Sequence, residues 1–496
     1  MKSLVKIFIL PLVLLTACVD SLDDYNLDQK RAPIVPAETL YSAAVKSLAD
    51  ILATPNVNSN NYRLYVQHWS TTQYLDEPRY VLNVRLIPQN FWDALYRDVL
   101  SDLKEARRLL EENQLLNASV KNNQLGQIGI MEAYSWMILV NTFGDVPYSD
   151  ALDTSKPLPK YDDAQTVYLA AMAKLDESIA LLDPTAAGFG IGEFLYSAKP
   201  AAQRIPSWIK FANSLKLKMA MVLVDNPETS AVATTAIQEA APNVFTSNAD
   251  NARFPYLPDP PSNNPISANL NLSLQSRRDF VGAKPFIDLL NELTDPRRIH
   301  FFNPVPGTSN FVGGYYGYTN NPVANFSEIS DKVKAPGFEA LFVDYSEVEF
   351  LLAEAVERGI IAGTAEEHYN KAITASITYW GGSAAEATTY LANPAVAYAS
   401  AAGDWKQKIG TQKWIALYNR GWDAWVEWRR LDYPVLLSPD QATPPAGQDP
   451  PSSALFIPMR MIYPISEQTL NPANRTAASG AIGDDVATTK LFWDVF

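Results

Sequence analysis

The fold is decided by the tryptophan-rich stretch "KWIALYNRGWDAWVEWRRLDYP", residues 413–434. Its large apolar side chains recur at helical spacing, which predicts a helical region that starts at Asp404, is broken near Gly421 and ends before Pro434. The residues on this spacing are Trp414, Leu417, Trp425 and Trp428. A row of indoles could also serve as a platform for sugar rings, but the helical spacing favours a buried core. Three charged residues of the same stretch, Glu427, Arg429 and Arg430, are expected to tie it to neighbouring helices through charge-assisted hydrogen bonds.

Further amphipathic helices are predicted on both sides of this stretch, from apolar residues spaced three and four apart. They cover residues 91–113, 124–143, 162–184, 206–222, 345–359 and 365–381. Pro206 is expected to open its helix, with Ser207 as the N-cap. Helices joined by short links favour α-hairpins packed side by side, although the sequence has no clean 34-residue repeat. Between them lie long Pro- and Asn-rich stretches, residues 226–271, 301–339 and 441–453, and loops of such length are usually functional or disordered.

The N-terminus has the pattern of an export signal. Two lysines, Lys2 and Lys6, precede the apolar run "IFILPLVLL", residues 7–15, which is too short to span a bilayer. The following "LTAC" resembles a bacterial lipobox, so Cys18, the only cysteine, is expected to be the acylated anchor. The alternative is an ordinary signal peptide with a free cysteine nearby. Acidic residues directly after the anchor, Asp20, Asp23 and Asp24, resemble the signal that places Bacteroidetes lipoproteins on the outer face of the outer membrane.

Composition excludes several classes of protein. The chain has 496 residues, of which 47% are hydrophobic, so it can bury a large core. Its formal net charge of −14 argues against nucleic-acid binding, which depends on neutralising phosphates. The three histidines, His68, His300 and His368, follow no metal-ligand spacing, and no phosphate-binding glycine loop is present. The sequence therefore predicts no metal, no cofactor and no nucleic-acid partner.

Eight features in a fixed order give the chain an end-to-end resemblance to the SusD/RagB family of outer-membrane nutrient-binding lipoproteins. After the lipobox come "FWDALYRDVLSDLKEA", "MEAYSWMILVNTFGDVPYSDAL", "SWIKFANSLKLKMA", "RRDFVGAKPFIDLLNELTDPR", "EVEFLLAEAVERG", residues 413–434 and "MIYPISEQTLNPAN". The resemblance implies a mainly α, SusD-like fold in which tetratricopeptide-like helix pairs support long irregular loops. It also implies that the protein captures a nutrient, usually a glycan, as the lid of a SusC-like TonB-dependent transporter in the outer membrane.

The implied organisation has three parts. Residues 1–17 form the lipoprotein signal peptide, and residues 18–36 the acylated cysteine and its tether. Residues 37–496 form a single SusD-like domain. Within it the helix-pair scaffold covers about 37–225 and 340–435, and a loop-rich ligand-binding part covers about 226–339 and 436–496.

Two aromatic stretches outside the helical pattern are the predicted ligand site. Sugar rings pack their C–H groups on aromatic faces, while amide, carboxylate and guanidinium groups bind the hydroxyls. The first stretch offers Trp69, Tyr74, Asp76, Arg79 and Tyr80. The second, "NFVGGYYGYTNN", offers Tyr315, Tyr316, Tyr318 and Asn320. Its glycines keep the rings out of regular helices and strands, which favours a loop-built site.

An enzyme is the competing interpretation, because glycoside hydrolysis needs only two carboxylates placed across the scissile bond. Residues 345–359 carry Glu347, Glu349, Glu354 and Glu357, but a solvated or inter-helix charged face explains them more simply. The S-x-x-K match at Ser207 lacks its companion motifs. We therefore expect a binding protein without catalytic residues. The alternatives are a peptide-binding lid of the same kind of transporter and, less favoured, a glycan-degrading lipoprotein.

Overall fold

The computed structural model describes residues 35–190, 192–270, 278–319 and 321–496. Ala37–Phe496 forms one compact unit, separate from Met1–Pro36. The predicted signal peptide, the acylated Cys18 and most of the tether lie outside the described residues. These assignments, and the division of residues 37–496 into a scaffold and a loop-rich part, stay predictions.

Helices dominate the described chain and strands are few, which confirms the mainly α fold class. The α-helices are α2 (Ala37–Ala53), α3 (Tyr62–Tyr65), α4 (Ile87–Asp93), α5 (Ser101–Glu112), α6 (Ala118–Phe143), α7 (Ala164–Leu181), α8 (Ala201–Leu223), α9 (Ser230–Ala240), α10 (Pro265–Leu270), α11 (Lys284–Glu292), α12 (Arg298–Phe301), α13 (Tyr345–Glu357), α14 (Ala365–Trp380), α15 (Ala384–Leu391), α16 (Trp405–Ala416), α17 (Gly421–Leu431), α18 (Ile465–Leu470) and α19 (Pro472–Ala481). Ala94–Leu100 is a π-helical segment that joins α4 to α5, and Ala241–Asn243 and Asn248–Asp250 are short 3-10 helices. The strands are β1 (Trp69–Thr71), β2 (Ala252–Phe254), β3 (Phe280–Gly282) and β4 (Ala340–Val343), and they pair antiparallel as β1–β3 and β2–β4.

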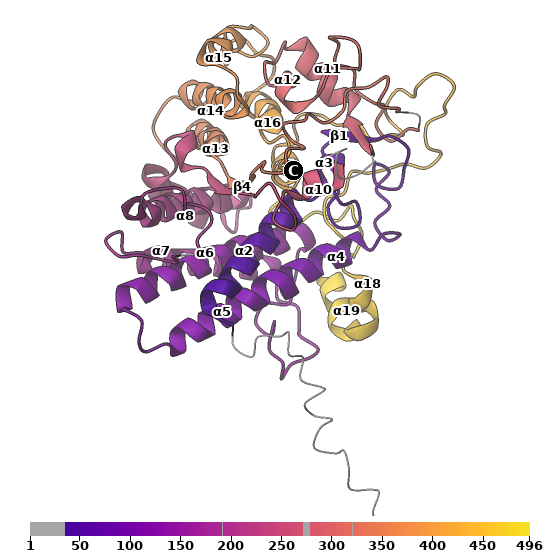
Figure 1. Ribbon diagram of the computed structural model, residues 1–496. Coiled ribbons are helices and arrows are strands. Elements are labelled where there is room, and N and C mark those ends of the chain that lie inside the picture. The colour runs from indigo at the N-terminus through magenta and orange to yellow at the C-terminus, as the bar shows by residue number, and fades with distance from the viewer. Residues whose placement is uncertain (1–34, 191, 271–277, 320) are drawn as a thin grey trace, which may run out of the picture. The chain divides into compact units, whose positions relative to one another are not determined.

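Consecutive helices pack against each other as pairs: α6 with α7, α8 with α9, α13 with α14, and α16 with α17. Figure 1 shows α2, α5, α6 and α7 gathered in one group, with α13, α14 and α15 in another. Side-chain caps begin several of these helices, as where Asn117 accepts from the N–H groups of Ser119 and Val120 at the start of α6. Gly144, with φ of +84°, ends the same helix. Among the described residues, no helix is both long enough and apolar enough to span a membrane.

Three predicted helix starts are wrong. The helix expected over 124–143 is α6, which begins at Ala118. The helix expected over 91–113 begins at Ile87 and passes through the π-helical turn before α5. The helix expected to open at Pro206 begins at Ala201, so Pro206 lies inside α8. Ser207 is therefore not an N-cap; its Oγ donates to the carbonyl of Gln203 at 2.8 Å, within the helix. Pro206 is the sixth residue of α8, so it lacks the N–H that would bond to the carbonyl of Ala202, and its ring crowds that carbonyl.

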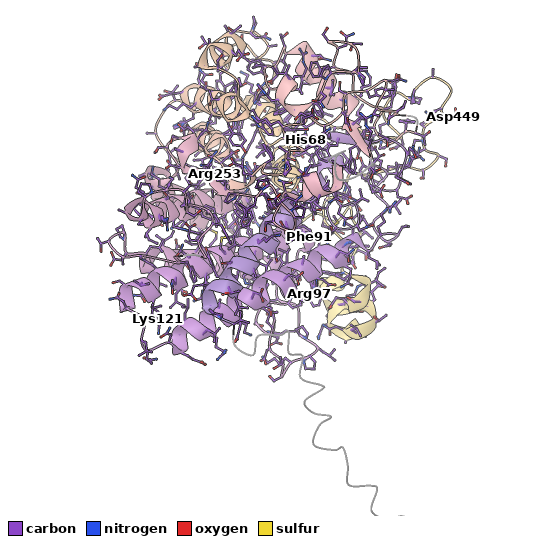
Figure 2. The ribbon with its side chains drawn as sticks, in the orientation of Figure 1. His68, Phe91, Arg97, Lys121, Arg253 and Asp449 are labelled. Atoms are coloured by element: carbon purple, nitrogen blue, oxygen red, sulfur yellow. The ribbon has the colours of Figure 1, made fainter. Side chains whose placement is uncertain are left out.

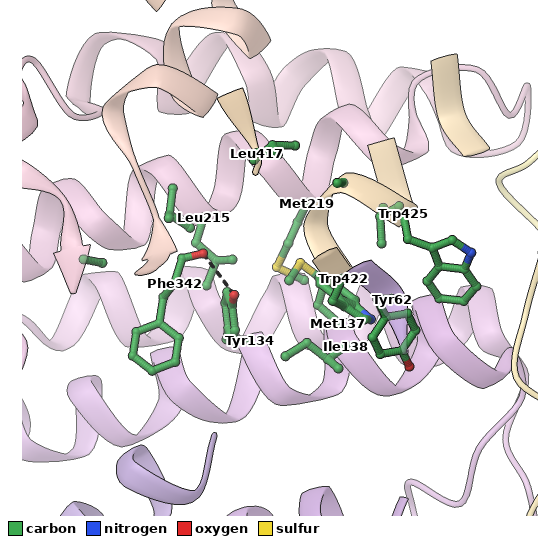
Figure 3. Packing of buried hydrophobic residues seen from close by; sticks show 14 of the residues in the cluster. Tyr62, Tyr134, Met137, Ile138, Leu215, Met219, Phe342, Leu417, Trp422 and Trp425 are labelled. Atoms are coloured by element: carbon green, nitrogen blue, oxygen red, sulfur yellow. Dashed lines mark hydrogen bonds between the residues drawn. The ribbon is translucent and has the colours of Figure 1, made fainter. Parts of the chain in front are cut away.

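Three of the four residues on the predicted spacing of residues 413–434 lie in the core, and Figure 3 shows two of them, Leu417 and Trp425, packed there. Trp414, Leu417 and Trp425 are buried, and the indole N–H groups of the two tryptophans donate to the carbonyls of Val66 and Pro458 at 2.9 and 2.6 Å. Each ring therefore buries a large apolar area without leaving its donor unpaired. Trp428 departs from the prediction, because it is only half-buried and borders a cavity.

The charged residues of α17 tie it to its neighbours, as expected for Glu427 and Arg430. Arg430 donates to Glu354 of α13 and to Glu427, and Lys413 of α16 lies 2.8 Å from Glu427. Burial alone raises the pKa of Glu427, but Arg430 and Lys413 outweigh it and hold the pKa at about 2. Arg429 also ties α17 to its neighbours, as expected: its guanidinium donates to backbone carbonyls of Asn141 and Met459, which connects α17 to α6 and to the C-terminal segment.

Candidate ligand-binding site

The structure brings the two predicted aromatic stretches together. Strand β1 pairs with β3, so that Trp69 lies opposite Gly282, and the loop after β1 runs beside residues 311–322. The Oγ of Ser70 donates to the carbonyl of Tyr315 at 3.2 Å, and Nε of Arg79 donates to the carbonyl of Gly317 at 2.9 Å. Arg79 thus holds the two loops together, a use of its guanidinium that the sequence did not indicate.

Asn321 is the central link between these loops. Its side chain is fully buried; Oδ1 accepts from the N–H of Tyr315 at 2.8 Å. Its Nδ2 lies 3.0 Å from the carbonyl of Thr71, 2.9 Å from that of Tyr315 and 3.1 Å from that of Tyr318. One amide therefore binds backbone groups of both loops at once, and it shares the Tyr315 carbonyl with the hydroxyl of Ser70 and the N–H of Tyr318. Asn320, its neighbour and a predicted ligand residue, lies outside the described residues.

A third loop, residues 436–450, completes the arrangement. The hydroxyl of Tyr318 donates to the carbonyl of Pro439 at 2.7 Å. Gly317 has φ of +75°, and a Cβ there would lie 2.3 Å from Cγ of Pro439, so only glycine fits. Thr319 and Gln448 exchange hydrogen bonds of 3.2 and 3.0 Å. Figure 2 marks this loop by Asp449. We call residues 72–86, 311–319, 321–322 and 436–450 together the three-loop surface.

Several predicted ligand rings are buried beneath this surface. Trp69 is 1% exposed and its Nε1 donates to the hydroxyl of Tyr418 at 3.2 Å, while Tyr316 and Tyr318 are also buried. Tyr80 is half-buried, with its ring 5.9 Å from that of Tyr65 and 6.5 Å from that of Tyr316. These side chains pack the loops onto the core and present no open face for a sugar. Their aromatic character alone could not distinguish packing from binding.

Tyr74 is the predicted ring that remains open, with 52% of its surface exposed. The guanidinium carbon of Arg85 lies 5.7 Å from its ring centroid, and Arg85 is ion-paired with the buried carboxylate of Glu77. Asp76 and Tyr315 lie on the same surface and are half-buried. An aromatic face backed by an oriented guanidinium is the combination that binds a sugar ring and its hydroxyls. Arg85 and Glu77 were not among the predicted residues, because their pairing depends on the fold of the loop.

The glutamates that an enzyme would need are engaged elsewhere. Glu347 is buried, 2.8 Å from Lys218 and 2.7 Å from Arg420, and Glu354 is buried against Arg430 and Arg358. Burial raises the pKa of each carboxyl group, but the basic partners outweigh it, and both pKa values lie below the ordinary range. Two carboxylates held ionised inside ion pairs cannot serve as a raised-pKa acid facing a substrate. They are inter-helix links.

The histidines are likewise explained by packing and pairing. His68 is buried, its Nε2 lies 3.0 Å from the carbonyl of Trp414, and burial lowers its pKa to about 3. Nδ1 of His368 lies 2.6 Å from Glu349, and His300 is partly exposed beside Gly381. Within the described ranges, no cluster of three His, Cys, Asp or Glu side chains could hold a metal ion.

Helix pairs that support a loop-built polar surface define a class of helical binding scaffold. The chain belongs to the SusD-like family, described as starch-binding and associating with the outer membrane, whose model matches residues 29–464. A solved chitin-binding protein is 26% identical, with a TM-score of 0.74 over 93% of this chain and 100% of that one.

Two other solved structures support the fold. A chitin-binding SusD homologue from Flavobacterium johnsoniae is 23% identical, with a TM-score of 0.71 over 92% of this chain and 99% of that one. A SusD homologue from Bacteroides thetaiotaomicron is 22% identical, with a TM-score of 0.74 over 93% and 99%. No curated protein sequence matches significantly.

Proposed function

We propose that this protein captures a glycan on the three-loop surface and delivers it to a SusC-like TonB-dependent transporter. In this proposal Cys18 carries the lipid anchor and the protein faces the exterior of the outer membrane. The observation that carries the binding role is the exposed ring of Tyr74, backed by Arg85 and Glu77 on a surface where the other predicted rings are buried or half-buried. Membership of a family described as starch-binding supports a glycan.

Chitin and starch are the first ligands to test. The relative that is 26% identical is named a chitin-binding protein, and the family description names starch. The acidic net charge of −14 disfavours polyanionic sugars. A peptide-binding lid of the same transporter is the second candidate, because an aromatic ring beside a guanidinium also suits a peptide. A glycan-degrading activity is third, since the buried glutamates of α13 offer no pair of open carboxylates.

The test is a single exposed substitution. Tyr74→Ala is expected to weaken binding of chitohexaose or maltohexaose about fivefold, because stacking on one aromatic face contributes about 1 kcal/mol. Leu115→Ala, at a residue 97% exposed and outside the three-loop surface, is the matched control and should bind as the wild type does. Isothermal titration calorimetry measures both. Equal affinity of Tyr74→Ala and the wild type would show that the ligand does not use this surface.

A further inference from the structure

A cavity of about 250 Å³ lies at the end of α17, between residues 436–441, 455–459 and 488–490. Its walls include two aromatic side chains and several polar ones. Those that the argument uses are Trp428, Leu436, Ser438, Gln441, Phe456 and Lys490. None of them belongs to the aromatic stretches that the sequence predicted as the ligand site.

The two aromatic side chains of the cavity, Trp428 and Phe456, keep exposed surface although the core is near. Phe456 is 62% exposed, and Trp428 is half-buried, unlike Trp414 and Trp425 of the same stretch. The indole N–H of Trp428 donates to the carbonyl of Pro434 at 3.1 Å, which fixes the ring while its face borders the cavity. Phe456 therefore offers an open apolar face beside the cavity, and Trp428 offers the part of its ring that the core leaves uncovered.

The polar groups are those that bind sugar hydroxyls. Oε1 of Gln441 accepts from the N–H of Ser438 at 3.3 Å, so its NH₂ group is the end that can bind a ligand oxygen. The ammonium of Lys490 lies 3.1 Å from Asp494, so its charge is already compensated. In an acidic chain, a cavity with amide and hydroxyl groups and a paired cation favours an uncharged ligand over an anionic one.

The core holds one wall of the cavity in place. The backbone N–H of Met459 donates to the carbonyl of Ala487 at 2.7 Å, and the carbonyl of Met459 accepts from Arg429 at 2.6 Å. The adjacent Pro458 carbonyl accepts from the indole of Trp425. Groups held by the core in this way lose little freedom on binding, which favours the affinity of a small ligand.

One loop connects this cavity to the three-loop surface. The carbonyl of Pro439 accepts from Tyr318 of the three-loop surface, while Ser438 and Gln441, on either side of it in the chain, line the cavity. A polymer bound across residues 436–441 could therefore contact both places at once, which raises its affinity without a stronger single contact.

We propose that this cavity is a second sugar-binding subsite, which takes one uncharged hexopyranose residue of the same polymer that the three-loop surface binds. This inference rests on the proposed function. The volume of about 250 Å³ lies below the roughly 300–1,000 Å³ of pockets for drug-sized ligands, which suits a single ring. Trp428 and Phe456 supply the apolar faces, and Gln441 supplies the polar edge, since the buried Ser438 already donates its hydroxyl to Asp440 at 2.7 Å.

The test compares short and long oligosaccharides by calorimetry on the full chain. The probes are chitobiose with chitohexaose, and maltose with maltohexaose. Phe456→Ala and Gln441→Ala change exposed side chains, so the fold is retained, and thermal unfolding checks this. Each is expected to weaken hexasaccharide binding at least fivefold and to leave disaccharide binding within twofold of the wild type. Tyr74→Ala should weaken both.

The outcomes separate this inference from the proposed function. If Tyr74→Ala loses affinity while Phe456→Ala and Gln441→Ala bind the hexasaccharide as the wild type does, the cavity is not a subsite and the proposed function stands. If the two cavity variants keep full sugar affinity but lose co-purification with the transporter, the exposed rings form a protein-docking surface and the subsite is refuted. If the wild type binds neither hexasaccharide, the proposed function fails, and the subsite with it.

Discussion

Replacing Asn321 should loosen the whole three-loop surface. Its oxygen accepts one hydrogen bond, and its NH₂ group, with two hydrogens, is shared among three backbone carbonyls of two loops. Counting three full hydrogen bonds at about 1 kcal/mol each, Asn321→Ala should lower the free energy of unfolding by about 3 kcal/mol. Asn321→Asp should lower it at least as much at pH 7, because an ionised carboxylate would face those carbonyls.

Urea unfolding followed by tryptophan fluorescence measures the change, and hydrogen exchange at the Tyr315 amide reports on the loop itself. Asn310→Ala is the control, since Asn310 lies in the same loop region with an exposed side chain. We expect the control to stay within about 0.5 kcal/mol of the wild type. If Asn321→Ala is no less stable than Asn310→Ala, and the Tyr315 amide stays protected, the central role assigned to Asn321 is refuted.

Two further substitutions test the scaffold and the loop. Glu427→Gln should lower the free energy of unfolding by about 3 kcal/mol at pH 7, because the pKa of about 2 in the folded protein lies well below the ordinary 4.5. The contribution of Glu427 is complete above about pH 4.5 and is lost towards pH 2. A stability difference between variant and wild type that stays constant during acid titration would contradict the pairing. Gly317→Ala should lower the free energy of unfolding by about 1–3 kcal/mol, because its Cβ would overlap Pro439. The control Gly480→Ala, at an open position of α19, should raise it by about 0.5–1 kcal/mol. If thermal unfolding ranks the two variants in the reverse order, the steric argument is wrong.

The helices could be predicted because their apolar periodicity is a local property of the sequence. Trp414 and Trp425 lie in the core where their spacing places them, and Arg430 forms the inter-helix links expected of it. The predicted helix start at Pro206 was wrong because proline is common at the first position of a helix, whereas here it lies inside α8. The strands of three or four residues carry no periodic signal of comparable strength.

The site was harder to predict because its chemistry depends on long-range packing. Trp69, Tyr316 and Tyr318 have the composition of a sugar platform but are buried, since neighbouring loops cover them. Tyr74 stays exposed, and Glu77 orients its partner Arg85. The spacing of these residues in the sequence does not predict the Glu77–Arg85 ion pair. The half-exposed face of Trp428 likewise follows from the cavity beside it, because helical spacing alone places it with the core tryptophans.

The central claim is that the protein captures a glycan without cutting it. Native electrophoresis of the full chain in gels cast with glycol chitin or soluble starch, with an assay for new reducing ends on the same samples, tests it most directly. The account predicts slower migration in at least one of the two gels and no new reducing ends. Unchanged migration in both gels, or slower migration with new reducing ends, would contradict it.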